Sequence, residues 1–166
     1  MKAVVLESLL AAVLVFSCVK SASEMLTSEE QVQALKQAEE LWDSHKIAEY
    51  EFVIKYECEC SECTLVARRV KVSGRIVTAV EYADDTPCTE SDEVKTHQTE
   101  TINDMFALIK RSLNHKTGNL DQVQITYDSH FGFPSHIFID PSAAYQHDNY
   151  GITITDFNLI SQRSNH

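Results

Sequence analysis

Residues 49–60 alternate between two kinds of side chain with a period of two. Apolar or cysteine side chains fill one set of positions: Tyr50, Phe52, Ile54, Tyr56, Cys58 and Cys60. Mostly charged side chains fill the other set: Glu49, Glu51, Val53, Lys55, Glu57 and Glu59. Because successive side chains of a strand point to opposite faces, this pattern predicts a β-strand with one apolar and one hydrated face. Such a strand is typical of an antiparallel sheet that is covered on one side only.

Two other segments have the period of an amphipathic helix. The first is predicted to begin at Ser28, whose hydroxyl forms a capping box with Gln31, and to end near His45. The second begins near Thr101, with Asp104 in its first turn. Each helix has one apolar face to bury: Val32, Leu35, Ala38, Leu41 and Trp42 in the first, and Ile102, Met105, Phe106, Ile109 and Leu113 in the second.

Five more strands are expected, at Thr64–Ser73, Ile76–Tyr82, Gln122–Asp128, Pro134–Asp140 and Gly151–Asn158. Gly74 suits a tight turn between the first two of these. One helix followed by three strands therefore occurs twice along the chain. We predict a single α+β domain over residues 24–166, in which two α-β-β-β units form one antiparallel sheet with both helices on one face and disulfides as staples.

The first 23 residues have the pattern of a secretory signal peptide. Lys2 precedes an apolar run over Leu9–Val15, and small residues follow at 21–23. The run is shorter than the roughly 20 apolar residues that a membrane span needs. We therefore expect residues 1–23 to be removed and the mature protein to be secreted to the extracellular space.

Removal of this leader takes Cys18 with it and leaves four cysteines: Cys58, Cys60, Cys63 and Cys88. An even number of cysteines in an oxidising compartment predicts two disulfides. Cys58 and Cys60 share a strand face and are poorly placed to bond each other. The preferred pairing is Cys60 with Cys63 and Cys58 with Cys88; the alternative is Cys58 with Cys63 and Cys60 with Cys88.

A turn motif occupies Tyr127–Asp140. Gly132 permits a positive φ at the turn, and Pro134 fixes the backbone where the next strand begins. Asp128 is placed to accept hydrogen bonds from the turn amides. These residues account for the motif in structural terms alone.

The same segment, Tyr127–Asp140, resembles the YDxxxGxPxxIxID hairpin of a family of secreted domains of unknown function, best known from bacterial envelope proteins. That family also has a tryptophan-bearing first helix, which Trp42 matches, and a strand ending in C-x-C, which Cys58 and Cys60 match. The resemblance covers about residues 42–140 and implies the same α+β fold. It implies no activity.

Four side chains near this hairpin are weak candidates for metal ligands: Asp128, His130, His136 and Asp140. Two imidazoles and two carboxylates suit a divalent cation, although no H-E-x-x-H or comparable spacing supports a site. The acidic loop Asp84–Glu93 lacks the register of a dedicated calcium loop and is expected to hold calcium weakly at most. We find no catalytic or cofactor-binding motif, and therefore expect neither enzymatic activity nor a cofactor.

The balance of charge is strongly acidic, with 14 basic and 25 acidic residues. The leader contains Lys2, Lys20 and Glu7, so the mature chain keeps 12 basic and 24 acidic residues, a net charge of −12. Such a surface disfavours nucleic acid and anionic membranes and favours cations, basic proteins and mineral surfaces. We predict a non-catalytic secreted matrix or interaction component whose acidic surface binds calcium, mineral or an extracellular protein. The alternative is a cystatin-like inhibitor or ligand-binding module, because such units also pack a helix on an antiparallel sheet.

Overall fold

The computed structural model describes residues 26–59, 62–83, 99–114, 122–141 and 149–160. Three helices lie in this part of the chain: α1 (Ser28–Ser44), the single-turn α2 (Glu62–Leu65) and α4 (Ile102–Asn114). Six strands accompany them: β1 (Glu49–Glu57), β2 (Arg68–Ser73), β3 (Ile76–Tyr82), β4 (Gln122–Tyr127), β5 (Pro134–Asp140) and β6 (Tyr150–Leu159). The leader over residues 1–23 and the acidic loop lie outside the described residues.

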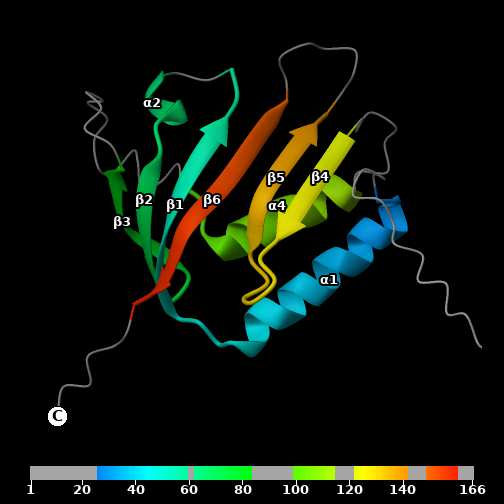
Figure 1. Ribbon diagram of the computed structural model, residues 1–166, viewed down its shortest axis with the longest axis horizontal. Helices are drawn as coiled ribbons and strands as arrows, with labels where there is room; N and C mark the ends of the chain where they lie inside the picture. Colours follow the sequence, from blue (N-terminus) through cyan, green and yellow to red (C-terminus); the bar gives the residue numbers. More distant parts are fainter. Residues whose placement is uncertain (1–25, 60–61, 84–98, 115–121, 142–148, 161–166) are drawn as a thin grey trace, which may run out of the picture.

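The strands form one antiparallel sheet in the order β3-β2-β1-β6-β5-β4 (Figure 1). Each α-β-β-β unit makes one half of the sheet, and β1 of the first unit pairs with β6 of the second. The predicted α+β fold is confirmed. None of the helices in the described part of the chain is long and apolar enough to cross a membrane.

Both long helices pack on the same face of this sheet, and one side chain of β1 contacts both. The ring centroid of Tyr50 lies 5.4 Å from that of Trp42 on α1. The Tyr50 hydroxyl accepts a hydrogen bond from the amide of Ile102, at the start of α4, over 3.3 Å. Lys110 of α4 also pairs with Glu39 of α1, so the helices contact each other as well. This face buries the hydrophobic core of the described residues, built around Phe52, Ile54, Val70, Met105, Ile109 and Ile137.

The start of α1 differs from the prediction by one residue. Thr27, not Ser28, is the N-cap, and its partner in the capping box is Glu30 rather than Gln31. The Glu30 amide donates to the Thr27 hydroxyl over 3.3 Å, while the Glu30 carboxylate accepts from the Thr27 amide over 2.9 Å. Thr27 and Ser28 each have Glu or Gln three positions later, so the sequence pattern alone does not decide which of them is the N-cap. Val32, expected on the buried face, is 47% exposed.

The expected ends of two strands are wrong: β1 ends early because its pairing with β6 ends, and β2 begins late because a short helix precedes it. The alternation of 49–60 predicts a strand as far as Cys60, but β1 ends at Glu57, where its last partner on β6 is Gly151. Beyond this pair no partner strand satisfies the backbone hydrogen bonds of the chain, which therefore leaves the sheet. Residues 62–65 then form α2, so β2 begins at Arg68 instead of Thr64.

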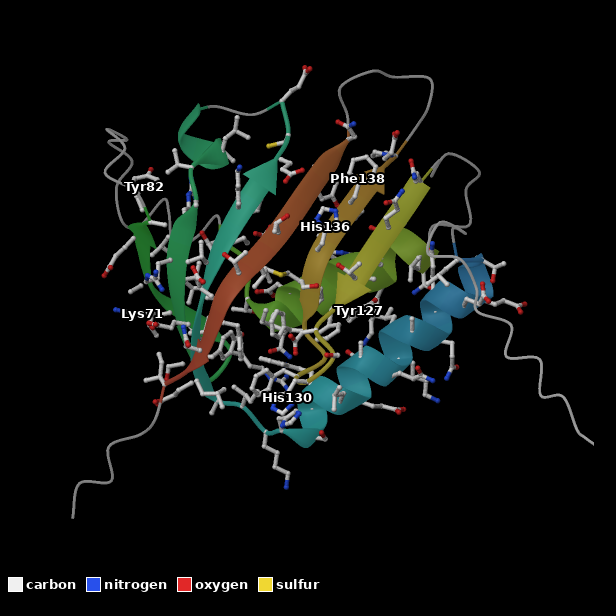
Figure 2. The ribbon with its side chains drawn as sticks, in the orientation of Figure 1. Lys71, Tyr82, Tyr127, His130, His136 and Phe138 are labelled. Atoms are coloured by element: carbon white, nitrogen blue, oxygen red, sulfur yellow. The ribbon has the colours of Figure 1, made fainter. Side chains whose placement is uncertain are left out.

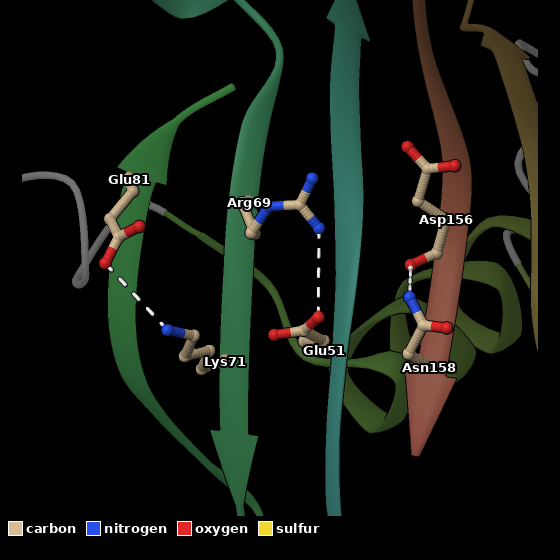
Figure 3. Close-up of polar contacts among 6 residues, drawn as sticks. All are labelled: Glu51, Arg69, Lys71, Glu81, Asp156 and Asn158. Atoms are coloured by element: carbon tan, nitrogen blue, oxygen red, sulfur yellow. Dashed lines mark hydrogen bonds and ion pairs between the residues drawn. The ribbon is translucent and has the colours of Figure 1, made fainter. Parts of the chain in front are cut away.

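The opposite face of the sheet carries no described helix and is largely polar. On its β1–β3 half, Arg69 lies 3.8 Å from Glu51, and Lys71 lies 3.9 Å from Glu81 (Figure 3). Exposed pairs of this kind stabilise a fold weakly, by about 0–1 kcal/mol each. Their consequence here is electrostatic, because opposite charges offset one another on this half of the open face.

Arg68 is an exception to the amphipathic pattern of β2. Its side chain is 1% exposed and lies on the helix-covered face, with the guanidinium carbon 5.7 Å from the centroid of the Tyr82 ring. Beside it the Tyr56 hydroxyl donates to the carboxylate of Glu100, just before α4. Sequence reasoning missed this polar cluster, although Arg68 is in phase with the apolar positions Val70 and Val72 of β2.

Candidate functional site

The β4–β5 turn is organised by one carboxylate. Asp128 Oδ1 accepts hydrogen bonds from the amides of His130, over 2.9 Å, and Phe131, over 2.6 Å. The Asp128 carbonyl accepts from the amide of Gly132 over 2.9 Å. The second carboxylate oxygen has no hydrogen-bond partner in the described part of the chain. Asp128 thus has the turn role that its sequence position suggests, with one oxygen left for a ligand.

Gly132 is required in this turn for two separate reasons. Its φ is +84°, in the left-handed region that favours glycine. A Cβ at this position would also overlap the carbonyl oxygen of Ala38 and lie 3.0 Å from Leu41 Cβ. The turn therefore sits directly on the backbone of α1. The sequence motif indicates the first reason but not the second.

The second half of the site comes from a β-bulge in β6. Val53 of β1 pairs with Thr155, but two residues earlier Glu51 pairs with Asn158, so β6 has one extra residue. Asp156 lies in this bulge with φ +49°. Such a shift reverses which face each following side chain points to. Regular alternation would place Asp156 on the face of buried Ile154; instead Asp156 is exposed.

The bulge turns the Phe157 ring toward the core. Its centroid lies 5.9 Å from Trp42 and 4.6 Å from Phe133, with the Phe133 and Phe157 rings stacked at 27°. Phe131 lies 5.1 Å from Phe157 at 50°. Four aromatic rings from α1, the turn and β6 therefore join where the turn meets the bulge. Figure 2 shows this region between the end of α1 and the lower end of the sheet, near the labelled His130.

A cleft opens between these two features because β5 and β6 separate. Their pairing extends from Ile139 with Tyr150 to His136 with Thr153 and then stops. Beyond it lies a cleft of about 290 Å³. Its walls contain two carboxylates, two hydroxyls and three phenyl rings: Asp128, Asp156, Ser135, Thr155, Phe131, Phe133 and Phe157, with Ile154.

The groups that line the cleft can interact with a cation. The backbone carbonyl of Asp156 accepts from the Asn158 side chain over 3.0 Å (Figure 3), while its carboxylate has no partner among the described residues. Carboxylates only accept hydrogen bonds, and aromatic faces attract cations. The Ser135 hydroxyl donates to the Thr126 carbonyl over 3.2 Å and keeps acceptor capacity. The cleft therefore suits a cationic group with an apolar stem.

Two tyrosines close to the cleft add no negative charge to it. Burial raises the pKa of the Tyr127 hydroxyl, and the nearby Glu39 carboxylate raises it further. Burial also raises the pKa of Tyr50 to about 12. Both hydroxyls therefore stay neutral at physiological pH, and the charge at the cleft is that of Asp128 and Asp156.

The structure does not bring the four candidate metal ligands together. Asp128 precedes the β4–β5 turn, while Asp140 pairs with Gln122 at the other end of the hairpin. His130 lies in the turn near His45, and His136 lies on β5 with its Nδ1 3.1 Å from the Thr153 hydroxyl (Figure 2). No three His, Cys, Asp or Glu side chains within the described ranges form a group that could hold a metal ion. Within the described residues, these four side chains therefore do not form a shared metal site.

The cysteine predictions fall mostly outside the described residues. Cys58 lies just after β1, and the backbone of Cys63 lies in α2. Cys60, Cys88 and the side chain of Cys63 are not described, so both pairings stay predictions.

Sequence reasoning missed Asp156 and Phe157, although the sequence contained a signal. Aspartate is depleted in strands, yet Asp156 follows the β-branched run of residues 152–155. An acidic residue that interrupts a strand is a reason to expect a bulge, because Asp tolerates positive φ better than most residues.

Comparison with known proteins gives a family without a function. The match to the family described as Family of unknown function (DUF6174) covers residues 34–159, from within α1 to the end of β6. No curated protein and no solved structure matches the chain. The matched region includes the turn, the bulge and the whole sheet, and on this basis the chain belongs to the DUF6174 family of unknown function.

Proposed function

We propose that this protein is a non-catalytic secreted interaction component that binds a basic segment of an extracellular protein. The observation that carries the proposal is the cleft between the β4–β5 turn and the β6 bulge, where Asp128 and Asp156 adjoin three phenyl rings. The net charge of −12 that remains without residues 1–23 supports it, because an acidic surface attracts basic partners and speeds their association. The leader pattern at residues 1–23 supports the extracellular setting.

A basic protein segment fits the cleft better than calcium or a mineral surface does. Calcium takes six to eight oxygen ligands, whereas much of this cleft is apolar ring surface. The β1–β3 half of the open face suits a mineral no better, because Arg69 and Lys71 offset the charge of Glu51 and Glu81. The same paired charges disfavour the cystatin-like alternative, which we expect to need an apolar face.

The test of this function is the binding of a basic peptide by the Asp156→Asn variant. Asparagine adopts positive φ as readily as aspartate does, so the bulge is kept and only the charge is lost. Glu81→Gln is the matched control, because it removes the same charge from β3, at one edge of the sheet. Binding is measured by isothermal titration at low and physiological salt.

We expect Asp156→Asn to weaken binding about fivefold. This factor corresponds to roughly 1 kcal/mol, the contribution of a partly exposed charge pair. Glu81→Gln is expected to bind almost as tightly as the unmodified protein. Equal weakening in both variants would show that only overall charge matters. A parallel titration with calcium chloride is expected to give no heat that depends on Asp156.

The disulfides are part of the same proposal. In the preferred pairing, Cys58 with Cys88 ties the acidic loop to the end of β1, and Cys60 with Cys63 closes the link into α2. A peptide map of the secreted protein under non-reducing conditions distinguishes this pairing from Cys58 with Cys63 and Cys60 with Cys88. Free thiols at all four positions would contradict both.

A further inference from the structure

We infer that the cleft selects an arginine side chain of the partner over a lysine side chain. This inference rests on the proposed function and names the group that the cleft recognises.

The cleft has room for one side chain. Its volume of about 290 Å³ is at the lower end of the range of about 300–1,000 Å³ for small-molecule sites. A folded segment is too large for it, whereas a single long side chain can enter between β5 and β6 where their pairing stops. The rest of the partner then lies over the exposed residues at its rim, Thr155 and Asp156.

The rings favour a flat cation. Phe131 and Phe157 are partly exposed at the cleft, with their ring centroids 5.1 Å apart, while Phe133 is 5% exposed and stacks against Phe157. A guanidinium group is planar and weakly hydrated, so it can stack on such a surface. An ammonium group is compact and strongly hydrated, so it loses more hydration in an apolar cleft.

The acceptors favour a group with several donors. The second oxygen of Asp128 and the carboxylate of Asp156 have no partner in the described part of the chain, and they come from different elements, the turn and the bulge. Guanidinium has five N–H donors in a fixed fork and can bond two acceptors in different directions while it stacks. Ser135 and Thr155 supply further hydroxyl acceptors at the same cleft.

The experiment compares two peptides that differ only at one central position, Arg in one and Lys in the other. Fluorescence anisotropy at physiological salt measures both dissociation constants with the unmodified, full mature protein. We expect the arginine peptide to bind at least fivefold more tightly. Amides of N-acetyl-arginine and N-acetyl-lysine serve as competitors, and the arginine amide is expected to displace the peptide at the lower concentration.

The variant Phe131→Leu then tests whether the aromatic rings cause the preference for arginine over lysine. Phe131→Leu keeps an apolar side chain at a partly exposed position, and we expect it to lower the preference for arginine to about twofold. Glu81→Gln is expected to keep the full preference. Equal affinity for the two peptides would overturn the selectivity while leaving the proposed function intact. The absence of binding to either peptide would overturn both, and this comparison requires no variant to fold.

Discussion

Gly132→Ala is expected to lower the free energy of unfolding by about 3 kcal/mol or more. A non-glycine residue in the left-handed region costs about 1–2 kcal/mol. The new methyl group would also overlap the Ala38 carbonyl oxygen and lie 3.1 Å from the Trp42 amide nitrogen, and overpacking of this kind costs typically about 1–3 kcal/mol. Urea unfolding followed by fluorescence measures the loss, since Trp42 is the only tryptophan of the chain.

Gly74→Ala is the matched control for this change. Gly74 also has a positive φ, of +68°, but a Cβ there would meet no atom within 4 Å. The control therefore bears only the conformational cost, about 1–2 kcal/mol. The difference between the two variants measures the contact of the β4–β5 turn with α1. Equal losses would contradict the close approach of the turn to the helix.

Trp42→Ala is expected to cost about 3–5 kcal/mol, the usual range for a large buried aromatic side chain. The Trp42 side chain is 4% exposed and makes edge contacts with Tyr50, Phe133 and Phe157, at centroid distances of 5.4, 6.4 and 5.9 Å. It therefore joins α1, β1, the turn and the bulge. Urea unfolding followed by circular dichroism measures the loss, because the variant has no tryptophan signal.

Val32→Ala serves as the control on the same helix. Val32 is 47% exposed, so its truncation is expected to cost less than about 1 kcal/mol. A cost below about 1 kcal/mol for Trp42→Ala would contradict the aromatic cluster as the link between α1 and the cleft. Because Phe133 and Phe157 form part of the cleft wall, we also expect Trp42→Ala to weaken peptide binding.

Much of the fold follows from local periodicity. The alternation that begins at Glu49 and the stripes of the two helices predict a sheet with one covered face, and the bounds of β3 and β5 agree with the prediction. These features depend on side chains near one another in sequence. The end of β1 does not, since it is determined by where β6 stops pairing, at Glu57 opposite Gly151.

Only the local half of the candidate site could be predicted from the sequence, because the other half depends on strand pairing. Asp128 and Gly132 act within their own turn, so the motif indicated their roles. The cleft also requires the separation of β5 from β6 and the bulge at Asp156, and both depend on partners far away in the chain. For Asp140, closeness in sequence suggested a closeness in space that the structure does not have. Asp140 pairs with Gln122 at the end of the extended β5, at the other end of the hairpin from Asp128.

The most direct test of the account is to map the proposed binding site by NMR on protein that begins at residue 24. ¹⁵N-labelled protein is titrated with the arginine peptide, and the amide shifts are followed. We predict that the largest changes lie at the cleft, in Phe131, Ser135, Thr155, Asp156 and Phe157. Changes concentrated at the amides of the exposed acidic residues of α1, Glu29, Glu30 and Glu40, with none at the cleft, would contradict it.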